Sequence, residues 1–109
     1  MKRGDVVIVA HGDFGRPRPA IVVQADELGE ATTTTLLVCP VTSDLTDRLP
    51  IRPSIEPKSE NGLRIKSQIM TDKMLAIPRD HVRQHIGKVD SETRGRLDSA
   101  LLLVLGLTR

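Results

Sequence analysis

Cationic and polar side chains suited to phosphate chemistry lie next to several predicted strands of this 109-residue chain. Arg18 precedes an apolar run at residues 20–23 and lies between two prolines, Pro17 and Pro19. Each proline fixes its own φ and restricts the preceding residue to extended conformations, so Arg18 is held at the start of a strand. A guanidinium binds phosphate well because it offers parallel donors and does not lose its proton. This stretch predicts a phosphate-binding arginine, with an ordinary surface loop as the alternative.

Further polar residues follow or flank other predicted strands. They are Thr42 and Ser43 after one strand, and Ser67, Gln68, Asp72 and Lys73 around another. The ends of strands can converge in a small bent sheet, which would bring arginine, hydroxyl and carboxylate together. These groups suit cleavage of RNA, which carries its own nucleophile in the 2′-OH and needs proton transfer and charge stabilisation at phosphorus. Each residue also has a structural alternative: Thr42 can bond the backbone, and Asp72 can pair with Lys73 or Arg79.

Other kinds of site have less support in the sequence. His11, His81 and His85 have no cysteine at ligand spacing, so structural or solvated roles are favoured over a metal site, and no cofactor is expected. Cys39, the single cysteine, lies in an apolar run and is interpreted as an inert core thiol that suits a reducing cytosol. Signatures of zinc proteases, phosphate-binding glycine loops and nucleophile elbows do not occur.

Composition indicates one domain, residues 1–109, with a net charge of +2 and a pI of about 9.0. This balance permits binding to nucleic acid without requiring it, because no basic block occurs. The chain has no Trp or Tyr and one Phe, too few aromatic rings for a broad base-stacking platform. No apolar run is long enough for a membrane span, so a soluble cytoplasmic protein is expected.

The hydrophobic pattern predicts an α+β fold. Strands are expected at residues 5–10, 20–25, 32–41, 49–55, 63–70 and 74–77. A helix follows from Asp90 or Ser91, with Gly106 just after its end. Its apolar residues cover more than one face, so it needs cover from the sheet or from a second subunit. The expected architecture is a strongly bent antiparallel sheet, a small barrel, closed by the C-terminal helix.

Taken in order, several short stretches resemble the MazF/PemK (Kid) family of toxin endoribonucleases over nearly the whole chain. They are residues 3–7 (RGDVV), 18–23 (RPAIVV), 39–43 (CPVTS), 61–63 (NGL), 67–73 (SQIMTDK), 86–89 (IGKV) and 100–107 (ALLLVLGL). The resemblance implies an SH3-like barrel of the CcdB and PemK type. It also implies a homodimer with an RNA groove and a cognate antitoxin that occupies this groove.

The resemblance further implies metal-independent cleavage of single-stranded mRNA at short motifs, leaving a 2′,3′-cyclic phosphate and a 5′-OH. By position, Arg18 is the principal catalytic arginine, Thr42 its companion, and Asp72 falls where some members have a proposed carboxylate base. The loop before Arg18 helps recognise RNA in the family. RNA-binding residues are therefore expected at Asp13, Phe14, Arg16, Ser43, Ser67, Gln68 and Lys73.

The chain departs from the family pattern around the carboxylate. Met70 occupies a position where some members have arginine, and Lys73 occupies one where glutamine is frequent. The assignment of general acid and base is therefore open, and His11 is interpreted either as part of the site or as a solvated residue. Two other functions also remain as alternatives. One is a non-catalytic toxin that binds a protein such as DNA gyrase, similar to CcdB, and the other is an interaction module on the same barrel.

Overall fold

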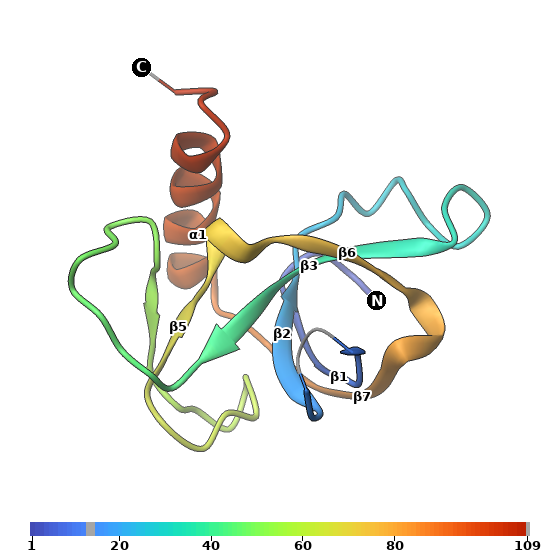
Figure 1. Cartoon of the computed structure of the whole chain (residues 1–109), viewed down its shortest axis with the longest axis horizontal. Coiled ribbons are helices and arrows are strands. Elements are labelled where there is room, and N and C mark those ends of the chain that lie inside the picture. The colour runs from blue at the N-terminus through green and yellow to red at the C-terminus, as the bar shows by residue number, and fades with distance from the viewer. Residues whose placement is uncertain (13–14, 109) are drawn as a thin grey trace.

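The computed structural model describes residues 1–12 and 15–108 of the chain. It is an α+β fold in which a curled antiparallel sheet packs against one α-helix (Figure 1). The strands are β1 (Asp5–Val9), β2 (Arg18–Val22), β3 (Thr35–Thr42), β4 (Ser54–Ile55), β5 (Ser67–Ile69), β6 (Leu75–Pro78) and β7 (Val82–Lys88). The helices are the 3-10 turns η2 (Thr71–Lys73) and η3 (Arg79–His81), and the α-helix α1 (Ser91–Val104). This arrangement confirms the predicted fold class.

The sheet curls because β3 pairs with different strands along its length. The strand order is β4-β5-β3-β2-β1-β7, and β6 pairs with the first half of β3 while β5 pairs with its end. Since β6 continues through η3 into β7, which pairs with β1, these strands enclose a small barrel. Alternating β-branched and aliphatic residues on β1, β2 and β3 supply side chains to both faces of this sheet.

Two apolar clusters therefore fill the molecule, one on each face of the sheet. The cluster inside the barrel comprises Val7, Val9, Ala20, Val22, Leu36, Val38 and Ile77. The cluster between sheet and α1 comprises Val6, Ile21, Val23, Cys39, Val41, Ile55, Ile69, Val89, Leu97 and Leu101. Cys39 is fully buried, and this burial raises the pKa of its thiol to about 12, which is typical of a core thiol.

Helix α1 begins and ends where its capping residues predict. The Asp90 carboxylate accepts a hydrogen bond of 2.8 Å from the Thr93 backbone N–H, which makes Asp90 the N-cap. At the other end Gly106 has a φ of +71°, and Leu107 N donates to Leu102 O at 2.8 Å. This is the Schellman arrangement that a glycine after the last turn favours.

Several predicted boundaries were wrong. Strand β2 begins at Arg18 itself, because Arg18 and Pro19 pair with Val9 and Ile8 of β1. Of the strand predicted at residues 49–55 only β4 forms, and of the strand predicted at residues 63–70 only β5 forms. Strand β7 was not predicted at all, because its sequence is mostly polar and its extended form depends on pairing with β1. No helix in the described part of the chain is long and apolar enough to cross a membrane.

Candidate active site

Arg18 begins β2 and Thr42 ends β3, so both lie at the same end of this antiparallel pair of strands, the Arg18–Thr42 edge. The paired register runs from Val22 and Val38 to Ala20 and Pro40, and Arg18 and Thr42 each lie two residues beyond it. Both side chains are partly exposed. The structure thus places an arginine and a hydroxyl that are 24 residues apart in sequence at the same end of two neighbouring strands.

The Thr42 hydroxyl also has a local structural partner. Its Oγ1 accepts a hydrogen bond of 3.0 Å from Asp44 N, which turns the chain as it leaves β3. The hydroxyl proton is not used in this bond, so the same oxygen can still donate to a ligand. The adjacent Ser43 is exposed.

The row of residues across the sheet continues from Thr42 into β5. Thr42 pairs with Gln68, and Gln68 pairs with Ser54 of β4. Gln68 is buried, and its amide exchanges two hydrogen bonds with the Thr46 backbone, at 3.0 and 2.8 Å. Ser67 is also buried and donates to Ile65 O at 2.9 Å. These bonds hold the loop that borders the Arg18–Thr42 edge.

Asp72 lies in η2, which packs against α1 (Figure 1). Strand alternation puts Arg18 and Thr42 on the same face as Ala20 and Val38, the barrel face of the sheet, whereas Asp72 lies in η2 beside α1. The carboxylate accepts two hydrogen bonds from Arg52, at 2.8 and 2.9 Å. This pairing lowers the pKa of Asp72 and raises that of Arg52. A carboxylate with a lowered pKa is a weaker proton acceptor.

Two residues predicted in the β1–β2 loop, Asp13 and Phe14, lie outside the described residues. Arg16 of the same loop is exposed, as is Lys73 in η2. Arg16 precedes β2 on the same connection as Arg18, so it lies beside the Arg18–Thr42 edge. Lys73 follows Asp72 and is therefore on the η2 side of the sheet.

Two further pairings of charged or titratable groups are not indicated by the sequence. Arg52 is the partner of Asp72, although Lys73 and Arg79 had been the expected partners. His81 of η3 forms a hydrogen bond with His11, with 2.9 Å between their Nδ1 atoms. Neither pairing has a signal in the local sequence, because the partners are 20 and 70 residues apart. Among the described residues, no three His, Cys, Asp or Glu side chains gather as a metal would require.

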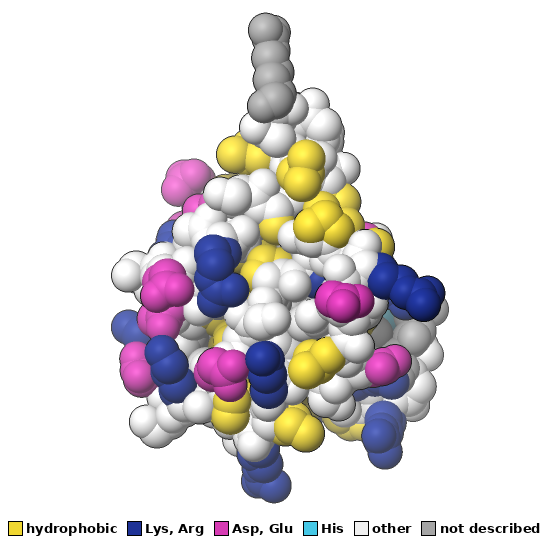
Figure 2. All heavy atoms as spheres, turned by 90° about the vertical axis from the view of Figure 1, so that its left-hand side faces the viewer, with side chains coloured by type: hydrophobic (Ala, Val, Ile, Leu, Met, Phe, Trp, Pro, Cys, Tyr) yellow, Lys and Arg dark blue, Asp and Glu magenta, His cyan; other side chains and the backbone are white. Residues whose placement is uncertain are grey.

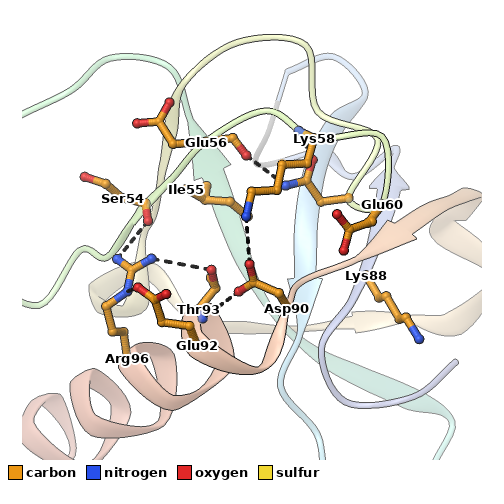
Figure 3. Close-up of a pocket in the computed structure, with 11 residues that line it drawn as sticks. Ser54, Ile55, Glu56, Lys58, Glu60, Lys88, Asp90, Glu92, Thr93 and Arg96 are labelled. Carbon is orange, nitrogen blue, oxygen red and sulfur yellow. Dashed lines mark hydrogen bonds and ion pairs between the residues drawn. The ribbon is translucent and has the colours of Figure 1, made fainter.

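A polar pocket of about 210 Å³ lies elsewhere, between the 54–61 segment and the start of α1 (Figure 3). Several of the charged groups that line it are already paired: Lys58 with Asp90 at 3.0 Å and Arg96 with Glu92 at 3.9 Å, and Arg96 also donates to Ser54 O at 2.9 Å. Its acidic and basic groups are mixed, so no single ligand charge is favoured. We interpret this pocket as a structural contact region that holds β4 against α1.

An apolar surface lies on the exposed side of α1. It consists of four leucines, Leu102, Leu103, Leu105 and Leu107, which are 46–70% exposed. A hollow of about 380 Å³ beside it is lined by Val23, Leu37, Met74 and Leu101 among others, with the Arg3–Asp98 ion pair at 2.6 Å. Figure 2 shows hydrophobic side chains gathered toward the C-terminal end of the molecule, with charges of both signs below them. Exposed apolar surface of this kind favours a protein interface.

Known proteins resemble this chain in sequence and in fold. Residues 2–105 match the model of a family described as PemK-like, MazF-like toxin of type II toxin–antitoxin system. The chain is 35% identical over 109 residues to a probable endoribonuclease MazF of Mycolicibacterium smegmatis, covering 98% of each chain. It is 28% identical over 113 residues to the endoribonuclease EndoA of Bacillus subtilis, covering 98% of this chain and 96% of the relative.

Among solved structures, the fold is similar to an endoribonuclease in complex with its cognate antitoxin from a mycobacterial species. The TM-score is 0.84, with 18% sequence identity, and the match covers 100% of this chain and 98% of the other. At this identity the likeness concerns the fold, a curled half-barrel with one C-terminal helix.

Proposed function

Because this chain belongs to the PemK-like, MazF-like toxin family, we propose that it is an endoribonuclease toxin that cleaves single-stranded mRNA in the cytoplasm. The relatives named as endoribonucleases match it almost end to end, which supports this activity. The observation that supports the proposal is that Arg18 begins β2 and Thr42 ends β3, at the same end of two neighbouring strands and both partly exposed. A guanidinium and a hydroxyl on neighbouring strands can contact one phosphodiester together.

The proposed reaction uses the 2′-OH of the RNA as nucleophile. O2′ bonds to phosphorus and the bond from phosphorus to O5′ breaks, which yields a 2′,3′-cyclic phosphate and a 5′-OH. Arg18 is the catalytic residue that binds the phosphate and stabilises the charge that grows on its oxygens. Thr42 donates a hydrogen bond to the same phosphate, and proline-restricted backbone around Arg18 reduces the entropy lost on binding.

The proposed RNA-binding surface extends from the Arg18–Thr42 edge. Arg16 and Ser43 are exposed beside it and can contact the phosphate or sugar of neighbouring nucleotides. Asp13, Phe14 and Lys73 remain predictions for RNA binding. Gln68 and Ser67 are proposed to act indirectly, because their polar atoms hold the 46–65 connection that forms one border of the site.

We also propose a homodimer and a cognate antitoxin as partners. The exposed leucines of α1 supply an apolar surface that a second copy can cover. A similar solved structure is a complex with its antitoxin, which supports the second partner. The antitoxin is proposed to occupy the RNA groove and so compete with the substrate.

The test is cleavage of a long unstructured RNA in the presence of EDTA, with the new 5′ and 3′ ends mapped. The wild-type chain should produce 5′-OH ends at short motifs, and Arg18→Ala should slow cleavage by about 100-fold or more while leaving thermal unfolding unchanged. Arg94→Ala, which removes an exposed arginine of α1, is the matched control. Retained cleavage in Arg18→Ala would remove the assignment. No cleavage by the wild type, with inhibition of gyrase supercoiling, would favour the protein-binding alternative.

A further inference from the structure

The Arg18–Thr42 edge continues onto a third strand. Strand β2 begins at Arg18, β3 ends at Thr42 and β5 begins at Ser67, and each is paired antiparallel with the next in the order β2-β3-β5. Because antiparallel neighbours run in opposite directions, the start of β5 lies at the same end of the sheet as the start of β2. Neighbouring strands are about 4.8 Å apart, so these two strand starts are separated by roughly 10 Å.

Two exposed basic residues, Arg64 and Lys66, come just before the start of β5 and therefore lie at this end of the sheet. The Arg64 guanidinium has no hydrogen bond or ion pair with another residue that the structure describes. Lys66 forms a loose ion pair with Glu56, in which the Nζ–Oε1 distance is 3.5 Å and the side chains are 51% and 63% exposed. A surface pair of this kind is weak and is screened by salt, so both cations are available to an anionic ligand.

The short segment that carries these two residues is held on both sides. Before it, the buried Asn61 accepts a hydrogen bond of 2.9 Å from Leu63 N through its side-chain oxygen. After it, the Ser67 hydroxyl donates to Ile65 O at 2.9 Å, and Ser67 pairs with Ile55 of β4. Because the backbone is already fixed, a ligand that binds here orders few additional groups, and less conformational entropy is lost on binding.

The opposite end of the sheet has the opposite charge. The connection between β2 and β3, residues 23–34, has three exposed carboxylates, Asp26, Glu27 and Glu30, and contains no lysine or arginine. Phosphate groups are therefore repelled from that end and attracted to the end where Arg16 and Arg18 are exposed or partly exposed. An RNA strand that meets Arg18 is favoured to remain at this end, where it crosses β3 and reaches the start of β5.

Two carboxylates, Asp44 and Glu56, follow β3 and β4 at this end, and both lie near cations. Glu56 is the partner of Lys66. The pKa of Arg52 is raised, first by its hydrogen bonds to Asp72 and also by the charge of Asp44, so Asp44 lies within electrostatic reach of a guanidinium. An RNA phosphate that binds Lys66 takes the place of Glu56.

We propose that Arg64 and Lys66 bind phosphates of nucleotides beside the cleaved bond, which extends the RNA-binding surface from Arg18 across β3 to the start of β5; this inference rests on the proposed function. At roughly 10 Å from the start of β2 they contact phosphates other than the one that Arg18 binds. They contribute affinity for RNA and take no part in bond making or proton transfer. Each phosphate contact releases condensed counterions, so the affinity becomes more dependent on salt.

The experiment compares the double variant Arg64→Ala/Lys66→Ala with wild type. The ligand is an RNA oligonucleotide of about 12 nucleotides that contains a mapped cleavage motif, with a 2′-deoxynucleotide at the cleaved position so that binding is measured without cleavage. The double variant should bind about tenfold more weakly at low salt, and its slope of log association constant against log salt should be smaller by about 1.4. With the all-RNA oligonucleotide, kcat/KM should fall by about tenfold, and this loss should lie in KM.

The matched control is Lys88→Ala/Arg94→Ala, which removes the same charge from exposed side chains elsewhere. Lys88 pairs with Asp5 at the opposite end of β1, and Arg94 lies on α1. This variant should bind the oligonucleotide within about twofold of wild type, because its charges lie away from the proposed path. Thermal unfolding of both double variants should match that of the wild type.

Three results would contradict the inference. Equal RNA affinity of the two double variants, with cleavage by the wild type intact, would overturn it and leave the proposed function standing. A loss of affinity that is as large at high salt as at low salt would overturn the phosphate contacts, because ionic contacts weaken as salt rises. A wild-type chain that cleaves no RNA would overturn the proposed function and this inference with it.

Discussion

Asp72 is the residue whose predicted role changes most once its contacts are known. Its carboxylate is 25% exposed, and Arg52 binds both of its oxygens with a side chain that is 11% exposed. This geometry fastens the segment before β4 to η2, and Thr71 adds a hydrogen bond from its hydroxyl to Ile51 O. Paired in this way, Asp72 holds in place the loop that contains Arg52, before β4. Its role as a base remains a prediction.

The pairing predicts a specific acid sensitivity. Because the folded-state pKa of Asp72 lies below its ordinary value of about 3.9, the pair stabilises the fold above that pH and loses this effect as pH falls further. Asp72→Asn should lower the free energy of unfolding by about 1 kcal/mol at pH 7, and this difference should shrink toward pH 2. Urea unfolding at pH 7, 4 and 2 measures it.

The matched control for this prediction is Asp47→Asn, which changes an exposed carboxylate in the connection between β3 and β4 that also contains Arg52. It should change the free energy of unfolding little at any of the three pH values. A deficit in Asp72→Asn that stays constant from pH 7 to pH 2 would show that the ion pair is not its cause.

At the scale of elements, the long connection between β4 and β5 is held against β7 by close backbone contact. Lys88 N donates to Glu60 O at 2.8 Å, and a Cβ added at Gly87 would overlap backbone atoms of Glu60 and Asn61. The Asn61 side chain is buried and bonds three backbone groups of its own loop. Strand β7 can therefore pair with β1 and still carry this loop only if residue 87 has no side chain.

We expect Gly87→Ala to lower the free energy of unfolding by about 3 kcal/mol, because backbone on both sides must move. Gly95→Ala is the natural comparison, since an added Cβ there meets nothing within 4 Å and lies within α1. That substitution should raise stability by about 1 kcal/mol through helix propensity. Thermal unfolding of the two variants beside the wild type measures both. Equal stability of Gly87→Ala and wild type would refute the close approach.

At the scale of the whole molecule, part of the apolar surface of α1 is not covered by the rest of the described chain. The helix buries Leu97 and Leu101 against the sheet, but its last turns leave Leu102, Leu103 and Leu105 about half exposed. At 109 residues the chain has a limited core, so a further apolar interface adds substantially to its stability. A dimer through this surface also explains why the predicted helix is apolar on more than one side.

Leu103→Glu should therefore convert a dimer to a monomer at micromolar concentration, because it puts a charge into the apolar interface. Sedimentation velocity of the wild type and the variant measures the change. Ile65→Glu is the matched control, since Ile65 is also an exposed aliphatic residue but lies in the loop before β5. A monomeric wild type, or a dimer that persists in Leu103→Glu, would exclude this surface as the interface.

The sequence by itself determined the elements that depend on local pattern: β1, β2, β3 and α1, together with the cap at Asp90 and the turn at Gly106. It also indicated Arg18 and Thr42, because both lie at strand ends that proline and β-branched residues define. Only the tertiary structure decided β7, the Arg52–Asp72 pair and the contact between His11 and His81. These features join segments 20 to 83 residues apart, and such pairings depend on how the sheet curls, which cannot be read from local hydrophobic periodicity.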